Sequence, residues 1–232
     1  MSDDFDPRLI ALVMALRKQG ITDARVLSAI ERTPRELFVG APFAHAAYDN
    51  TALPIACGQT ISQPYVVAVS TLALELGESH RVFEIGTGSG YQAAVLSHLC
   101  RRVYSVERHR ALHLEAERRF KALRIPNIAT KLGDGFKGWP EQAPFDRVLL
   151  TAAIPEVPES LIAQLKPGGI LVAPVGVQPV ADLESNCQLL TKMIRTETGV
   201  KKEALIPVVF VPMLPGIPQE SRDSHDGSDR KK

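Results

Sequence analysis

The sequence predicts an α/β fold: a doubly wound, mostly parallel sheet of seven strands with helices on both faces and an N-terminal helical and loop cover over the substrate. From residue 81 onward, short apolar runs alternate with segments of helical apolar spacing, the pattern of a parallel sheet. The strand at residues 82–85 breaks into Gly86-x-Gly88-x-Gly90 and then into a helix. At 232 residues and 45% hydrophobic content, the chain can bury one such core.

The N-terminal elements come first. Apolar residues recur at helical spacing over residues 7–19, ended by Gly20, and over residues 23–32, which follow a Thr22/Asp23 capping signal. Residues 34–62 contain several Pro and Gly residues and no regular repeat of apolar residues, so we expect a long loop. Long loops inside compact chains are usually functional. Pro64 suits the first position of a helix running to about residue 76, since its missing N–H would be unpaired there.

The sheet region follows. We expect strands at residues 82–85, 103–106, 128–132, 147–151 and 170–175, with helices from 91, over 112–123 and after Pro158. Residues 166–169 form a turn into the strand at 170–175. Residues 187–194 and 205–211, joined by a polar turn at 196–199, are expected to close the sheet as an antiparallel pair. Periodicity does not give the order of the edge strands.

These elements divide the chain into three expected parts. Residues 1–63 form the helices and the substrate-covering loop, residues 64–214 form the cofactor-binding core, and residues 215–232 form a disordered tail. The last part is polar and poor in large apolar side chains, so it offers little burial to offset its ordering entropy.

Composition narrows the function classes. The chain carries 27 basic and 26 acidic residues, a net charge of +1, so we expect no nucleic-acid or membrane partner. Three cysteines without Cys-x-x-Cys spacing argue against a disulfide framework and against a metal site, and point to the cytoplasm. The six histidines show no metal-ligand spacing. The start is acidic, and no apolar run is long enough to span a bilayer. We favour a monomer, although the sequence does not define the oligomeric state.

The glycine loop distinguishes between two kinds of cofactor. A dinucleotide site has the spacing Gly-x-Gly-x-x-Gly, and here Tyr91 occupies the third glycine position while Gly90 comes one residue early. With Glu84 inside the strand end, the pattern resembles the first motif of S-adenosylmethionine-dependent methyltransferases. A nicotinamide dehydrogenase is therefore a poor alternative.

Two further strand ends support the same ligand. Glu107 ends the strand at 103–106, where a carboxylate can accept both ribose hydroxyls, although such a residue alone is more often a surface charge. Asp134 and Gly135 follow the next strand, where methyltransferases of this class place a carboxylate near the adenine amino group. Because the carboxyl ends of parallel strands meet at one edge, seven residues are expected to bind one S-adenosylmethionine: Glu84, Gly86, Gly88, Ser89, Glu107, Asp134 and Gly135.

Thr60 and Ser62 are the candidate acceptor-binding residues. In an extended segment they share one face, and two hydroxyls on one face can hold a carboxylate. The alternative is that either hydroxyl caps the helix that begins at Pro64.

The chain resembles the protein-L-isoaspartate O-methyltransferase family over residues 26–216. The segments that carry the resemblance are Thr33-Pro34-Arg35-Glu36-Leu37-Phe38-Val39, Ala47-Tyr48, Leu53-Pro54-Ile55, Gly58-Gln59-Thr60-Ile61-Ser62-Gln63-Pro64, Val106-Glu107-Arg108, Gly133-Asp134-Gly135, Pro144-Phe145-Asp146, Thr151-Ala152-Ala153, residues 165–176 and Val211-Pro212-Met213-Leu214. The heptapeptide at 58–64 is highly specific to this family, whereas generic methyltransferases share only the glycine loop.

The resemblance implies a seven-stranded, Rossmann-like methyltransferase sheet and methyl transfer to the α-carboxylate of L-isoaspartyl residues, which starts repair of damaged proteins through a succinimide. It places Ser62 at the active-site serine position, with Thr60 beside it. Asn50 and Ala56 stand where the family commonly has aspartate and glycine. Because both flank the substrate loop, a same-fold carboxyl methyltransferase with another acceptor stays an alternative, as does a non-catalytic S-adenosylmethionine-binding module.

Overall fold

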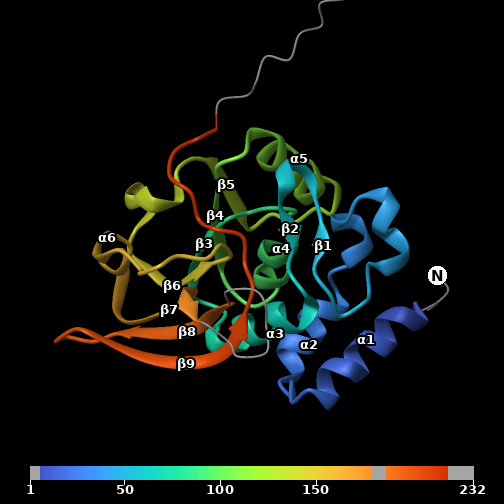
Figure 1. Ribbon diagram of the computed structural model, residues 1–232, viewed down its shortest axis with the longest axis horizontal. Helices are drawn as coiled ribbons and strands as arrows, with labels where there is room; N and C mark the ends of the chain where they lie inside the picture. The colour runs from blue at the N-terminus through green and yellow to red at the C-terminus, as the bar shows by residue number, and fades with distance from the viewer. Residues whose placement is uncertain (1–5, 179–186, 219–232) are drawn as a thin grey trace, which may run out of the picture.

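The computed structural model describes residues 6–178 and 187–218. Within them lies a seven-stranded sheet in the order β5-β4-β3-β6-β7-β8-β9 (Figure 1). The strands are β3 (Arg81–Ile85), β4 (Arg102–Glu107), β5 (Ile128–Leu132), β6 (Phe145–Leu150), β7 (Leu165–Gln178), β8 (Cys187–Arg195) and β9 (Val200–Val208). β5, β4, β3, β6 and β7 are parallel, and β8 and β9 complete the sheet as antiparallel strands. The expected fold class and the closing antiparallel pair are confirmed.

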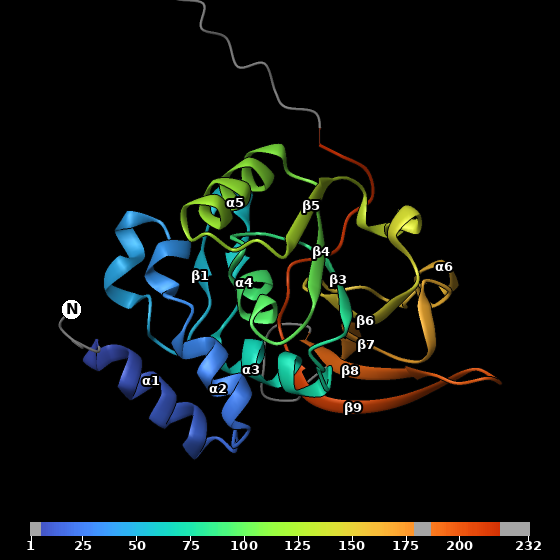
Figure 2. The ribbon, with the colours of Figure 1, turned by 180° about the vertical axis from the view of Figure 1, so that it is seen from behind.

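The main helices are α1 (Pro7–Lys18), α2 (Ala24–Glu31), α3 (Pro64–Ala73), α4 (Tyr91–Ser97), α5 (Arg110–Ala122) and α6 (Glu159–Ile162). The Asp23 side chain caps α2 by accepting hydrogen bonds from the N–H groups of Arg25 and Val26. Pro64 is the first residue of α3, as expected, but the helix ends at Ala73 rather than near residue 76. Helices α1 and α2 lie on one side of the molecule and the β8–β9 hairpin on the other (Figure 2).

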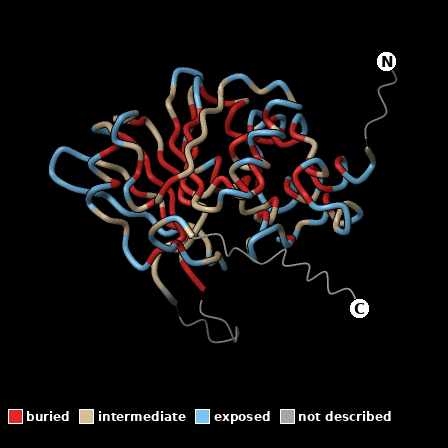
Figure 3. Tube along the Cα trace, turned by 90° about the horizontal axis from the view of Figure 1, so that it is seen from above, coloured by how far each residue is buried: buried red, intermediate tan, exposed pale blue. Residues whose placement is uncertain are grey.

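Both faces of the sheet are buried. Val82, Val103 and Leu149 contribute to the apolar cluster that also contains α1, α2, α3 and α4 residues, whereas their chain neighbours Phe83, Tyr104 and Val148 belong to the cluster with α6. Successive side chains of a strand point to opposite faces, so helices on both sides give the apolar runs of a parallel sheet. Buried residues accordingly run through the centre of the molecule (Figure 3).

Two strand predictions need correction. β9 spans Val200–Val208 rather than 205–211, because pairing with β8 resumes at Arg195–Val200 directly after the turn. Residues 201–204 are exposed on this edge strand, so no apolar pattern marked them. Residues 166–169 lie inside β7, where the pairing shifts from Phe145–Leu165 to Arg147–Ile170. The expected turn is thus an irregularity within one long strand.

The long loop at 34–62 contains short elements that the sequence did not reveal: η1 (Arg35–Phe38), η2 (Ala41–Ala46), β1 (Leu53–Pro54), η3 (Ala56–Gly58) and β2 (Thr60–Ile61). β1 and β2 pair antiparallel, with Leu53 opposite Ile61. Two further 3-10 turns, η4 (Gly135–Lys137) and η5 (Pro140–Gln142), follow β5. We call residues 34–62 the cover.

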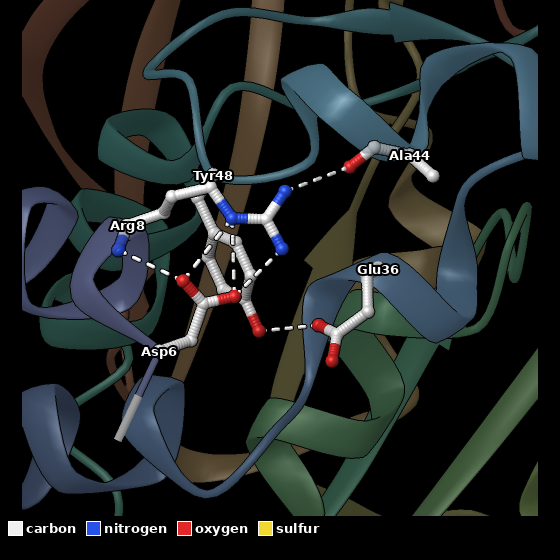
Figure 4. Close-up of polar contacts among 5 residues, drawn as sticks. All are labelled: Asp6, Arg8, Glu36, Ala44 and Tyr48. Carbon is white, nitrogen blue, oxygen red and sulfur yellow. Dashed lines mark hydrogen bonds and ion pairs between the residues drawn. The ribbon is translucent and has the colours of Figure 1, made fainter. Parts of the chain in front are cut away.

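A polar cluster connects α1 to this cover (Figure 4). Asp6 caps α1 and pairs with Arg8, whose Nη1 donates to the carbonyl oxygen of Ala44 at 3.3 Å. The Arg8 guanidinium lies 5.3 Å from the ring centroid of Tyr48, and the Tyr48 hydroxyl donates to Glu36. Burial and this hydrogen bond raise the pKa of Tyr48 well above its usual value, so the hydroxyl keeps its proton. The start of α1 therefore holds the cover in place.

The expected disordered tail falls largely outside the described residues, at 219–232, as does the acidic start at 1–4. Residues 215–218 are described, and the carbonyl oxygens of Pro215 and Gly216 accept hydrogen bonds from Arg108.

Candidate active site

A cavity of about 380 Å³ opens at the carboxyl ends of β3, β4 and β6, between the sheet and the cover. One wall comes from the sheet side and contains Ile85, Gly86, Thr87, Gly88, Ser89, Tyr91, Gln92, Val106, Glu107, Arg108, His109, Gly135, Thr151 and Ala152. The opposite wall comes from the cover and α3 (residues 57–62 and Val67) and from a C-terminal segment (residues 211–214). Ligands of open parallel sheets bind at this edge.

The glycine loop requires its glycines. Gly86, Gly88 and Gly90 have φ values of 98°, 54° and 91°, a region that other residues adopt at a cost. A Cβ on Gly86 would also approach Thr151 Oγ1 to 2.4 Å, and a Cβ on Gly90 would approach Phe120 to 2.8 Å. The Thr151 hydroxyl donates to the carbonyl oxygen of Gly86 at 2.6 Å. The end of β6 therefore braces the loop against the cavity.

Glu107 joins the second strand end to this loop. Its side chain is 4% exposed and lines the cavity. Oε2 accepts a hydrogen bond from the Gly88 N–H at 2.8 Å, and Oε1 accepts one from the His109 N–H at 2.9 Å. Since a carboxylate has about four acceptor positions, two stay available for ligand hydroxyls.

Glu84 occupies a different place from the one expected for a ligand-binding residue. Its side chain is fully buried within β3, accepts a hydrogen bond from the Ser105 hydroxyl, and does not line the cavity. The Ser105 hydroxyl also shares a hydrogen bond of 2.6 Å with the Thr87 hydroxyl. Burial raises the pKa of Glu84 to about 8. Glu84 thus supports the glycine loop from beneath through Ser105 and Thr87.

The two candidate residues after β5, Asp134 and Gly135, differ in position. Gly135 lines the cavity, and a Cβ there would approach Ile85 Cγ2 to 2.4 Å. Asp134 does not line it; its carboxylate caps η4 by accepting from the Phe136 N–H at 2.9 Å. Ser89 lines the cavity while its hydroxyl accepts from the Tyr91 N–H at 3.3 Å, at the start of α4.

Thr60 and Ser62 both line the cavity, on the wall opposite the glycine loop. The N-cap of α3 is Gln63, which makes no side-chain capping bond, and neither hydroxyl of Thr60 or Ser62 has a hydrogen-bond partner among the described residues. The helix-capping alternative is therefore excluded. Thr60 pairs through β2 with Pro54, and the Ser62 carbonyl oxygen accepts a hydrogen bond from Arg35.

Asn50 and Ala56 lie outside the cavity wall. Asn50 Oδ1 accepts from the Tyr65 N–H at 2.9 Å, in the first turn of α3, and its Nδ2 donates to Gln19 Oε1 at 3.1 Å. Asn50 therefore performs the capping that Gln63 does not. Ala56 is exposed at the start of η3.

The sequence did not predict a function for several residues in or next to the cavity. The segment after β9 returns across the strand ends, drawn in red in Figure 1, and Met213 donates its N–H to the Ala153 carbonyl oxygen at 2.7 Å. Arg108 holds its far end through Pro215 and Gly216. Ile55, in the cover, is not part of the cavity wall, but its Cδ1 atom lies 3.7 Å from where a Cβ on Gly88 would stand. Residues 53–55 and 211–214 belong to segments that carry the family resemblance, which was the one sign in the sequence that they matter. What they do could not be predicted, because it depends on long-range contacts.

Two observations concern other functions. Among residues 6–178 and 187–218, no group of three His, Cys, Asp or Glu side chains is arranged to hold a metal ion. Among those same residues, none of the helices has both the length and the apolar character that crossing a membrane requires.

Solved structures are similar over most of the chain. One, a protein-L-isoaspartate O-methyltransferase, aligns with a TM-score of 0.79 at 29% identity, covering 90% of this chain and 67% of that one. Another, a Plasmodium falciparum protein described as a protein-L-isoaspartate O-methyltransferase in complex with S-adenosyl-L-homocysteine, aligns with a TM-score of 0.73 at 23% identity, covering 88% and 97%. The fold and the glycine-loop cavity define the class of the S-adenosylmethionine-dependent methyltransferases.

Sequence comparison narrows the class. A model of the protein-L-isoaspartate(D-aspartate) O-methyltransferase family matches residues 8–216. Curated relatives named protein-L-isoaspartate O-methyltransferase are 57% identical in Paramagnetospirillum magneticum, over 93% of this chain and 98% of the relative, and 56% identical in Maricaulis maris, over 91% and 96%. The chain belongs to the protein-L-isoaspartate(D-aspartate) O-methyltransferase family. The resemblance inferred from its motifs is confirmed.

Proposed function

We propose that this protein transfers a methyl group from S-adenosylmethionine to the free α-carboxylate of L-isoaspartyl residues in damaged proteins and peptides. Family membership supports the reaction. The observation that carries the assignment to this site is that Thr60 and Ser62, whose hydroxyls have no partner among the described residues, line the same cavity as the glycine loop. The product is a methyl ester, whose methoxy group leaves far more readily than the oxygen of a free carboxylate. The neighbouring backbone amide nitrogen can therefore displace methanol to form the succinimide, and hydrolysis of the succinimide returns part of it to aspartate without further catalysis.

The cavity fits S-adenosylmethionine. A loop of glycines at positive φ lets a ligand approach the backbone closely, and the free acceptor positions of Glu107 suit ribose hydroxyls. Gly86, Gly88, Ser89, Glu107 and Gly135 would hold the cofactor by direct contact. We place Glu84 and Asp134 behind them, as supports of the glycine loop and of η4. When bound, the cofactor supplies an electrophilic sulfonium methyl group.

The protein residues then act by position. A carboxylate with an ordinary pKa near about 4 is already ionised at neutral pH, so no general base is needed. Thr60 and Ser62 orient its oxygens, and the cover and residues 211–214 exclude water from the approach. A very strong hydrogen bond to the carboxylate would stabilise the ground state, so we assign Ser62 to orientation rather than activation.

The test is transfer of labelled methyl from S-adenosylmethionine to an isoaspartyl peptide and to its aspartyl twin at neutral pH. Labelling of the isoaspartyl peptide alone is the expected result. Labelling of neither peptide, with cofactor binding intact, would overturn the proposal in favour of a different carboxylate acceptor. Absence of cofactor binding would exclude methyl transfer altogether and leave only a non-catalytic module that binds a peptide.

The setting of the reaction is part of the proposal. We place the enzyme in the cytoplasm, acting on isoaspartyl proteins as a monomer without nucleic-acid or membrane partners. The near-neutral charge and the free thiols of Cys57 and Cys100 support this setting. We also retain the division into N-terminal helices and substrate-covering loop (1–63), cofactor-binding core (64–214) and tail (215–232).

A further inference from the structure

Arg35 lies behind the acceptor wall of the cavity. Its side chain is completely buried in η1, and Nη2 donates to the carbonyl oxygen of Ser62 at 2.8 Å and, more weakly, to that of Thr51 at 3.4 Å. The guanidinium carbon lies 4.8 Å from the ring centroid of Tyr91. Ser62 and Tyr91 both line the cavity, whereas Arg35 does not. One buried arginine therefore contacts the acceptor loop and the helix that follows the glycine loop.

No carboxylate balances the charge of Arg35 among the described residues. There it forms no ion pair, and its Nε and Nη1 atoms have no hydrogen-bond partner, so its charge is met by two carbonyl oxygens and the Tyr91 ring. Burial lowers the pKa of Arg35 to about 10, so it still carries its charge at neutral pH. An unpaired buried cation is normally strongly destabilising, because neither water nor a carboxylate replaces its lost hydration.

A bound carboxylate would supply the missing charge. The cavity wall formed by Ser62 and Tyr91 separates Arg35 from the space where an acceptor carboxylate lies under the proposed function. Charges interact strongly through a low-dielectric interior, so Arg35 can favour an anion there without touching it. The tyrosine ring and the cover shield this interaction from solvent ions.

We propose that Arg35 is a positioning residue for the acceptor carboxylate: it fixes Ser62 through its carbonyl oxygen, and its unpaired charge makes the cavity select an anionic over a neutral acceptor group. This inference rests on the proposed function. A purely structural Arg35 would hold the cover equally well for charged and uncharged ligands. The discriminating quantity is therefore the preference of the cavity for a carboxylate over an isosteric amide.

The experiment measures binding of two peptides to the full chain by calorimetry, in saturating S-adenosylhomocysteine so that the sulfonium charge does not contribute. One peptide carries an isoaspartyl residue with a free α-carboxylate, and the other carries the α-carboxamide. The native protein should prefer the carboxylate. Arg35→Met should reduce this preference on the order of tenfold, and Arg35→Lys, which keeps a charge, should retain most of it.

Arg147→Met is the matched control. Arg147 is half-buried on β6 and also donates to carbonyl oxygens, those of Leu74 and Glu75, but far from the acceptor wall. Its loss should lower thermal stability without changing the carboxylate preference. An unchanged preference in Arg35→Met would overturn the inference even if affinity for both peptides fell.

Salt dependence in the native protein provides a measurement that needs no variant. A buried charge is screened little, so the carboxylate preference should persist from low to high salt. Its collapse at high salt would assign it to exposed charges and contradict the role of Arg35. If the native protein methylates isoaspartyl peptides yet binds carboxylate and amide equally, the inference fails while the proposed function stands. If it binds neither peptide, the proposed function itself fails.

Discussion

The carboxylate of Glu107 accepts a hydrogen bond from the backbone N–H of Gly88, with 2.8 Å between Oε2 and N. This contact joins the end of β4 to the glycine loop that follows β3. The other oxygen, Oε1, holds the His109 N–H, so one side chain fixes two loops at the cavity edge. The residue proposed to hold the ribose thus also shapes the loop beneath it.

Removal of this carboxylate should weaken cofactor binding. Glu107→Ala deletes two charge-assisted hydrogen bonds and the ribose acceptor, a loss of about 2 kcal/mol or more, which corresponds to on the order of 30-fold in S-adenosylhomocysteine affinity by calorimetry. Glu141→Ala is the control, since Glu141 is exposed, pairs with Lys131 and lies outside the cavity wall. Equal affinity in Glu107→Ala and the native protein would contradict the assigned role.

The glycine loop offers a test of steric fit. Gly90 and Gly168 both have positive φ, at 91° and 75°, but a Cβ would meet Phe120 at 2.8 Å only at Gly90. Gly168→Ala therefore adds backbone strain of about 1 kcal/mol, and Gly90→Ala adds overpacking of about 1–3 kcal/mol to that. Denaturant unfolding should show the larger loss for Gly90→Ala. Equal losses would mean that Phe120 moves aside freely.

The sequence was most informative where local chemistry decides structure. Pro64 at the first position of α3, the Asp23 cap of α2 and the Gly86-x-Gly88-x-Gly90 turn all follow from backbone rules that involve a few residues. The apolar runs of β3 to β7 follow from burial on both faces of a parallel sheet.

Long-range contacts account for the remainder. The polar residues of β9 form a strand because β8 offers a partner, and not because of their own pattern. Glu84 belongs to the glycine-loop motif, yet its burial directs it to Ser105 rather than to a ligand. Arg35 belongs to a segment that carries the family resemblance. Its position behind Ser62 could not be predicted, because the two residues are 27 positions apart and meet only when the cover folds.

Ser62 should affect turnover more than cofactor binding. Its hydroxyl has no partner among the described residues and lies on the wall opposite the glycine loop. Ser62→Ala removes a hydrogen bond to a charged group, so methyl transfer to an isoaspartyl peptide should fall about 10–100-fold. Affinity for S-adenosylhomocysteine should stay near that of the native protein. Loss of both together would contradict the separation of acceptor and cofactor walls.

Glu84 should make stability depend on pH in an unusual direction. Burial raises its pKa to about 8, from 4.5 for an ordinary glutamate, so between these values the folded protein holds a proton that the unfolded chain has released. The contribution of Glu84 is therefore complete at lower pH, declines as pH rises through this window by up to about 1.4 kcal/mol per unit, and levels off above about pH 8.

The measurement is urea unfolding of the native protein and of Glu84→Gln across this window. Glutamine does not titrate, so the variant should gain stability relative to the native protein as pH rises. Glu141→Gln serves as the control. Hydrogen bonds and Lys131 lower the pKa of Glu141 below its ordinary 4.5, so its contribution changes only at more acidic pH and the difference between this variant and the native protein should stay constant across the window. A constant difference between Glu84→Gln and the native protein would show that Glu84 is ionised throughout.

Asn50, which stands where the family commonly has aspartate, tests whether this difference affects peptide binding or only the capping of α3. Its Oδ1 caps α3 through the Tyr65 N–H, and its Nδ2 donates to Gln19, while its side chain lies outside the cavity wall. Asn50→Asp keeps the acceptor and adds a negative charge near the start of a helix, which favours the folded state by about 0.3–1 kcal/mol. Gln19 is exposed and can turn its amide to donate to the new carboxylate. Asn50→Ala loses both contacts and should cost about 1 kcal/mol or more.

Thermal unfolding should therefore rank the three proteins with aspartate first, the native asparagine next and alanine last. The KM for an isoaspartyl peptide should differ little between the native protein and Asn50→Asp, because neither side chain reaches the acceptor. A large change in KM with unchanged stability would place residue 50 in direct contact with the peptide, and the substitution would then be a determinant of acceptor choice rather than a change of helix cap.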